Sequence, residues 1–121
     1  MTVRVTLVKT AVLGSYPSLQ PVAGSADLIE TAADATNKNQ FTASGNDLVI
    51  AHNTGASPYT VTISSVNDDE GRTGDITAYS VAAGAIAFFG PFKRHGWAQT
   101  NGMIYLEASN ASVKFAVVAL P

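Results

Sequence analysis

The sequence predicts an all-β protein, an antiparallel two-sheet β-sandwich of about eight strands, jelly-roll or immunoglobulin-like, with little or no helix. Apolar runs of strand length recur about every ten residues, separated by short turns rich in Gly, Pro, Asn and Asp. No helical pattern is long enough to connect two parallel strands. The 121 residues are expected to form one domain, 1–121, because a chain of this length fits a single hydrophobic core.

The stretch from Gly74 to Pro91 is apolar at nearly every position, and the rest of the chain is organised around it. It predicts two strands that meet at a tight turn over Ala82-Ala83-Gly84. The second run, from Ile86 to Phe89, carries apolar side chains on both faces. A strand covered on both faces belongs in the middle of a packed body, which is where we expect this one.

Before this stretch, one segment has a clear strand pattern and two segments have ambiguous patterns. Residues 2–9 alternate apolar and polar side chains, which predicts one half-buried strand. Residues 10–24 contain Pro17 and Pro21 and predict an extended arm, either a loop tied across the sandwich or a limb reaching a neighbouring subunit. Residues 26–35 could form two helical turns or a short strand, and we favour the strand.

The remaining strands are separated by polar turns. Asn101-Gly102 lies between apolar runs and is typical of a β-hairpin, because both residue types accept a positive φ. Strands are predicted over residues 40–43, 48–53, 59–64, 103–108 and 113–120.

The composition excludes several classes of protein. Charged residues make up only 13% of the chain, about half the usual share, and the net charge is −2. Two interpretations of this charge-poor surface stay open. It suits a protein whose surface is covered by other protein subunits, or the shortage of charge has no functional meaning. The scattered Lys and Arg residues predict no nucleic-acid binding. No apolar run reaches the length of a membrane helix and no signal peptide is recognisable, so we expect a protein made in a cytoplasm.

No pattern of catalytic or metal-binding residues is present. The chain has no Cys, and the two histidines are isolated, with His52 expected to be half-buried and His95 exposed. The acidic loop at 68–70 lacks the spacing of a calcium-binding loop and predicts a solvated turn. Glu107 alternates with apolar neighbours on a strand, as a solvent-facing carboxylate does. We therefore expect no enzyme, no metal and no cofactor.

One cluster, Phe92-Lys93-Arg94-His95-Gly96-Trp97, places two aromatic residues around three basic ones at a turn. Trp and Arg are enriched at protein-binding hot spots. Three interpretations stay open: a protein contact, a platform on which a sugar stacks, and a core Trp beside an exposed basic turn. The candidate protein-interface residues, taken from this cluster and from the proline-containing arm, are Tyr16, Pro17, Pro21, Phe92, Lys93, Arg94, His95 and Trp97.

The C-terminal part resembles a known group of viral proteins. The order YTVTISSVNDDEGRTGDITAYSVAAGAIAFFGPFKRHGW, followed by NGMIYLEASNASVKFAVVALP, is similar to the small β-sandwich virion proteins of tailed bacteriophages, above all to head decoration (cement) proteins. The resemblance covers roughly residues 48–121 and lies in the sequence of turns and strands, without a diagnostic motif.

This resemblance implies a structural role outside the capsid. It implies a protein made in the host cytoplasm that binds the major capsid protein on the outer surface of the head, often as a homotrimer, and stabilises contacts between capsomers. The alternative is a carbohydrate- or receptor-binding module of a phage tail or baseplate. That alternative requires Trp97, Tyr105 or Tyr79 to be exposed together as a stacking face.

Overall fold

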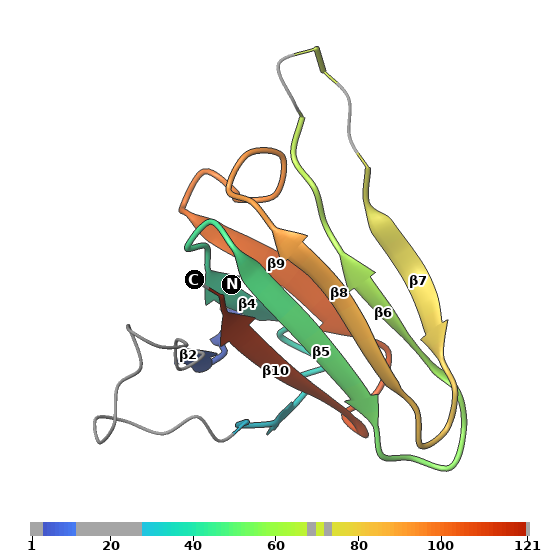
Figure 1. Ribbon diagram of the computed structural model, residues 1–121. Helices are drawn as coiled ribbons and strands as arrows, with labels where there is room; N and C mark the ends of the chain where they lie inside the picture. Colours follow the sequence, from blue (N-terminus) through green and yellow to red (C-terminus); the bar gives the residue numbers. More distant parts are fainter. Residues whose placement is uncertain (1–3, 12–27, 68–69, 72–73, 121) are drawn as a thin grey trace, which may run out of the picture.

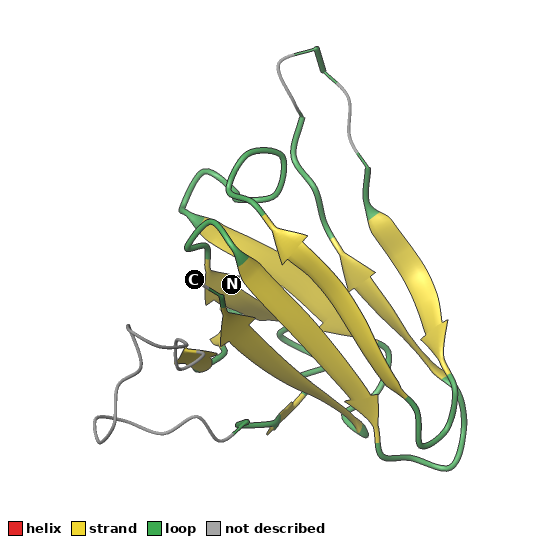
Figure 2. Cartoon of the chain, in the orientation of Figure 1, coloured by secondary structure: helices red, strands yellow, loops and turns green. Residues whose placement is uncertain are grey.

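The structure, a computed structural model, describes residues 4–11, 28–67, 70–71 and 74–120. These residues form strands and loops, with no helix among them (Figures 1 and 2). The predicted all-β sandwich is confirmed, although the described residues form ten strands instead of about eight. The strands are β1 (Val5–Thr6), β2 (Lys9–Ala11), β3 (Thr31–Ala32), β4 (Asn39–Thr42), β5 (Asp47–Asn53), β6 (Tyr59–Ile63), β7 (Ile76–Val81), β8 (Ile86–Phe92), β9 (Met103–Ala108) and β10 (Val113–Ala119).

The strands are arranged in two five-stranded sheets, which form the two layers of the sandwich (Figure 1). Sheet A has the order β1-β4-β9-β6-β7, and sheet B has the order β2-β10-β5-β8, with β3 also paired to β10. Most pairs are antiparallel, but β1 with β4 and β2 with β10 are parallel. The sequence predicted only antiparallel pairing, because two- and three-residue strands leave no pattern from which their direction can be read.

The hydrophobic core lies between the two sheets. Alternate residues of each central strand face inward, as the period of two predicts, and their burial removes apolar surface from water. Each such side chain contributes about 1.5–3 kcal/mol when fully buried. The largest apolar side chains with no more than 1% exposure are Phe41, Phe115, Ile63, Ile104, Leu106, Val49, Val61, Val113 and Val117.

Consecutive strands usually lie in different sheets. Among the described strands, β6 and β7 are the one consecutive pair that hydrogen-bonds together. The turn that the sequence predicted over Ala82-Ala83-Gly84 is present, with the Ala85 N–H donating to Ala82 O at 2.9 Å, and it carries the chain from β7 in sheet A to β8 in sheet B. Asn101-Gly102 also forms a turn, with Gly102 at φ 80°, but the strands on either side of it, β8 and β9, lie in different sheets and form no hairpin.

Two predictions about strand position are wrong. Residues 2–9 were predicted as one strand, but β1 and β2 belong to different sheets, and the buried Leu7 lies where the chain crosses between the layers. The run from Ile86 to Phe89 was predicted in the middle of the body, but β8 is the edge strand of sheet B. Residues 31–32 form the short strand favoured over a helix.

Candidate functional site

The most distinctive surface of the described chain is the side of the sandwich formed by β7 and β8. Each is the last strand of its sheet, and Figure 1 shows them on the same side of the body, joined by a short loop. Tyr79 is 50% exposed, Ile86 55% and Phe88 66%. We call the open edges of β7 and β8, together with these three side chains, the β7–β8 rim. Large apolar side chains this exposed, grouped on one side, are typical of an interaction surface.

The alternation of side chains along β8 explains this exposure. Ala87 and Phe89 point into the core, so Ile86 and Phe88 point out from sheet B. Phe88 lies opposite Ile50 of β5. Tyr79 faces the space between the layers, where its ring meets Phe89 edge-on at a centroid distance of 5.3 Å. The rim therefore has two apolar parts: Ile86 and Phe88 on the outer face of sheet B, and Tyr79 at the edge of the core between the two sheets.

The backbone of β8 at this edge is also unpaired within the described chain. Asn53 N–H donates to Ala85 O at 3.0 Å, so odd-numbered residues of β8 turn their N–H and C=O groups toward β5. Because these groups alternate in an antiparallel ladder, those of Ile86 and Phe88 point toward the open edge. Among the strands that the structure describes, β8 pairs with β5 alone.

The first half of β8, up to Phe89, lacks the usual protection of an edge strand. Natural edges are kept short, carry charges, or contain a proline or a β-bulge, which prevent pairing with other chains. In β8 the proline (Pro91) and the register shift lie after Phe89. No residue from 76 to 92 is charged, and both strands are at least six residues long. The opposite side of the sandwich ends in β1, β2 and β3, which are two or three residues long and contain or adjoin Arg4, Lys9 and Glu30. Protection by charge and by short length is therefore missing on the β7–β8 side, although a register shift and the positive φ of Ala78 interrupt β7.

A buried amide fixes the position of the rim. Asn53, at the end of β5, is fully buried and its Nδ2 donates to Ser57 O at 2.8 Å and to Val81 O at 2.9 Å. Its Oδ1 accepts the Gly55 N–H at 2.9 Å. Its backbone N–H donates to Ala85 O, and its backbone C=O accepts a hydrogen bond from the Gly84 N–H in the loop between β7 and β8. This one residue connects β5, the end of β7 and the crossover to β8.

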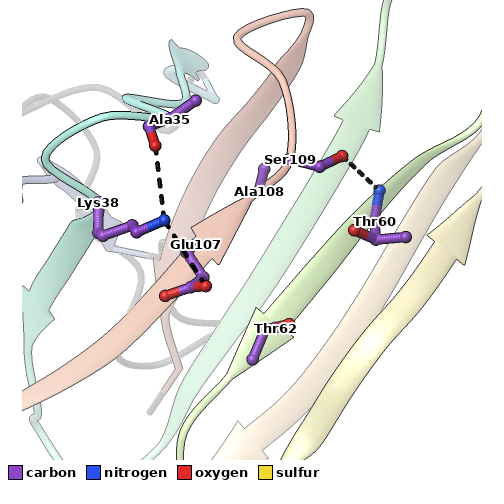
Figure 3. Close-up of a pocket in the computed structure, with 7 residues that line it drawn as sticks. All are labelled: Ala35, Lys38, Thr60, Thr62, Glu107, Ala108 and Ser109. Carbon is purple, nitrogen blue, oxygen red and sulfur yellow. Dashed lines mark hydrogen bonds and ion pairs between the residues drawn. The ribbon is translucent and has the colours of Figure 1, made fainter.

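A shallow depression lies on the outer face of sheet A, with a volume of about 280 Å³ (Figure 3). Lys38 Nζ and Glu107 Oε1 form an ion pair across it at 3.8 Å, and both side chains are more than a third exposed. Glu107 is the one carboxylate among its lining residues, so the depression holds no pair of carboxylates. It also has no aromatic ring for a sugar to stack on. The lining residues are Ala35, Lys38, Thr60, Thr62, Glu107, Ala108 and Ser109.

Two carboxylates with lowered pKa values maintain local structure. The backbone N–H of Asn37 donates to Asp34 and is the main cause of its lowered pKa; desolvation partly offsets this effect, and the Thr36 N–H and the Asn37 side chain add to it. The hydroxyl and N–H of Ser65 donate to Asp75 and lower its pKa in the same way. Both carboxylates hold turns, and neither faces a cleft.

The two histidines have the burial that the sequence predicted. His52 is half-buried and pairs with Glu30 at 3.1 Å between Nδ1 and Oε2, while His95 is exposed. Within the described ranges, no three side chains of His, Asp or Glu lie close enough together to hold a metal ion. The described residues also contain no helix with the length and hydropathy needed to cross a membrane.

The predicted interface residues of the basic turn fall into two groups. Phe92 is 2% exposed, and its ring meets that of Trp97 at 4.7 Å, with both packed against the core. Lys93, Arg94 and His95 are exposed. The arrangement matches the interpretation of a core-packed Trp beside an exposed basic turn. Arg94 also has a structural contact, because its Nη1 donates to Ala43 O at 2.6 Å.

The predicted interface residues of the arm, Tyr16, Pro17 and Pro21, lie outside the described residues, as do most of positions 10–24. The aromatic residues required by the sugar-binding alternative do not share one face. Trp97 packs against Phe92, Tyr79 lies at the rim, and Tyr105 lies beneath the Arg4 guanidinium at 4.1 Å from the ring centroid.

The sequence interpretation missed Ile86 and Phe88 as surface residues. It assigned them to the core because both faces of the strand are apolar. A signal that could have corrected it is Pro91, since proline within a strand is confined to edges and bulges. Comparison with known proteins finds no matching family model, no match among curated proteins and no match among solved structures.

Proposed function

We propose that this protein is a structural virion protein, a capsid decoration protein that binds the outside of a tailed-phage head and stabilises contacts between capsomers. The observation that carries the proposal is the uncharged apolar rim on a chain with only 13% charged residues. Such a surface favours permanent contact with other protein subunits over free solution. The sequence resemblance to head decoration proteins suggests that these other subunits belong to a phage capsid. The proposed role requires no catalysis.

The exposed basic turn is the proposed contact with the shell. Lys93, Arg94 and His95 project from the loop after β8, and the Phe92–Trp97 pair anchors that loop to the core. A rigidly anchored loop costs little conformational entropy when it binds. A protein that binds only the assembled shell stabilises that shell by mass action.

Co-sedimentation of the full chain with empty heads assembled from the major capsid protein of the same genome tests this proposal. The wild-type chain is expected to bind saturably and to raise the temperature at which the heads disassemble. The double variant K93E/H95E is expected to bind at least about tenfold more weakly, because both changes reverse or add charge at the contact.

K38E provides the control, since the Lys38 side chain is 39% exposed on the outer face of sheet A and its ion pair with Glu107 contributes no more than about 1 kcal/mol. It should bind heads as the wild type does. No sedimentation of the wild-type chain with the heads would contradict the proposed function. If K38E loses as much binding as K93E/H95E does, the basic turn is not a specific contact with the shell.

A further inference from the structure

We infer that β8 pairs edge to edge with β8 of a second copy of this chain, so that sheet B continues across a two-fold axis. The inference concerns what covers the β7–β8 rim, and it does not depend on the proposed binding to heads.

The open groups of the rim require a strand as their partner. The N–H and C=O groups of Ile86 and Phe88 point along the plane of sheet B toward the open edge, as the pairing of β8 with β5 determines. An apolar groove alone could receive many kinds of surface, but a row of free backbone donors and acceptors is satisfied best by an added strand.

The side chains of β8 favour a second copy of this chain as the partner that supplies the added strand. In antiparallel pairing centred on Ala87, Ile86 lies opposite Phe88 of the second copy, and the two backbones exchange four hydrogen bonds. No charged residue lies between 76 and 92, so a two-fold axis brings no like charges together. A self-complementary patch is the requirement for a two-fold interface.

Pro91 limits the length of the pairing. It has no N–H to donate, and Gly90 before it has φ +105°, which breaks the regular strand. The regular pairing therefore covers about residues 85–89. The register centred on Ala87 places the axis in the middle of that segment.

The three exposed side chains of the rim supply less than half of the area of a standard interface. Tyr79, Ile86 and Phe88 together expose roughly 300 Å² per copy, compared with about 800 Å² per partner in a standard interface. The backbone edges and the neighbouring small residues of β7 and β8 supply further area.

This geometry gives a dimer, whereas the resemblance to decoration proteins implies a trimer. Two-fold pairing uses the β8 edge of both copies and leaves no free β8 edge to extend the assembly. The mass of the particle therefore distinguishes the two arrangements.

Light scattering of the full chain during size exclusion, from about 1 μM to about 1 mM, measures this mass. The wild type is expected to reach about twice the 12.5 kDa of one chain. F88K and I86K should raise the dimer dissociation constant at least about tenfold, because each desolvates a charge at the centre of the interface. V8K is the matched control, because Val8 is 61% exposed and lies between β1 and β2.

A second measurement tests the register. The chain has no Cys, so a mixture of I86C and F88C chains contains only the introduced thiols. Opposed hydrogen-bonded residues have Cα atoms about 5.5 Å apart, within the range for a disulfide. The oxidised mixture should therefore give a cross-linked heterodimer in excess over the products of either variant alone.

Several results would overturn the inference. The first is the mass of a single chain at every concentration, and the second is the mass of a trimer. The third is a V8K variant whose dimer dissociation constant rises as much as those of F88K and I86K. Circular dichroism checks that F88K and I86K keep their β-structure, and because both positions are more than half exposed, the fold should tolerate them. A folded F88K chain that still dimerises as tightly as the wild type would also contradict the pairing.

Discussion

At the scale of single residues, stability depends on a few buried polar groups that hold turns. Asp47 is fully buried at the start of β5. Its carboxylate accepts the Ser44 N–H at 2.8 Å and the Ser44 hydroxyl, and Lys9 Nζ lies 3.5 Å away. The carboxylate therefore closes the turn between β4 and β5 and neutralises the charge on β2.

We predict that D47A lowers the free energy of unfolding by about 2–3 kcal/mol, because it leaves the Ser44 N–H without its buried acceptor. Urea denaturation followed by circular dichroism measures the change. E107A is the control, because the exposed Lys38–Glu107 pair should contribute no more than about 1 kcal/mol. Similar losses in the two variants would show that burial of Asp47 does not matter.

Asp34 and Asp75 predict how stability depends on pH. Hydrogen bonds lower both pKa values in the folded chain, so each carboxylate contributes stability that is present above about pH 3.9, the pKa of Asp in an unfolded chain. That contribution is lost as the pH falls through the lowered folded pKa. We predict that D34N/D75N is less stable than the wild type at pH 7 and that the difference shrinks at pH 2. A difference in urea midpoint that is the same at both pH values would refute this assignment.

At the scale of elements, β8 changes direction at Gly90 to let Phe92 return to the core. Gly90 has φ +105°, and a Cβ there would lie 2.9 Å from both Asp47 O and Phe92 N. Both the backbone conformation and the space therefore require glycine. The bend marks the register shift between β5 and β8 near Asp47 and Val49.

We predict that G90A lowers the free energy of unfolding by about 2–3 kcal/mol through the combined strain and clash. G74A serves as the control, because a Cβ at Gly74 would meet no atom within 4 Å and the φ of this residue is not positive. It should change stability by no more than about 0.5 kcal/mol. Thermal unfolding of both variants makes the comparison, and a G90A chain as stable as G74A would show that the bend can relax.

The elements differ in how well the sequence predicted them. β5, β6, β9 and β10 alternate clearly or are strongly apolar, and their predicted ranges agree with the structure within one residue at each end. β1 and β2 were predicted as one strand, because the alternation from Val3 to Lys9 does not show that the chain changes layer at Leu7. Local pattern identifies a strand but does not determine its sheet.

At the scale of the whole molecule, the sandwich was predictable and the order of its strands was not. Order depends on contacts between residues far apart in sequence, such as Phe115 of β10 opposite Ala51 of β5. The position of β8 was misread for a related reason. A strand apolar on both faces can be covered by its own chain or by another subunit, and the sequence of one chain does not separate these cases.

The candidate site was accordingly the least predictable part. The sequence pointed to Phe92 and Trp97, which pack against the core, and it placed Ile86 and Phe88 inside the body. The exposed basic residues of the same turn, at 93–95, remain predicted contacts. The placement of Ile86 and Phe88 is the error, and it concerns apolar side chains, whose exposure is decided by strand order and by partners.

The central claim is that another strand covers the edge of β8. Amide hydrogen exchange of the wild-type chain, resolved by residue and measured at high and low protein concentration, tests it most directly. At high concentration the amides of Ile86 and Phe88 should exchange as slowly as that of Ala87, which pairs with β5 inside each copy. On dilution they should exchange rapidly while Ala87 stays protected. Rapid exchange of Ile86 and Phe88 at every concentration, beside a protected Ala87, would contradict the claim.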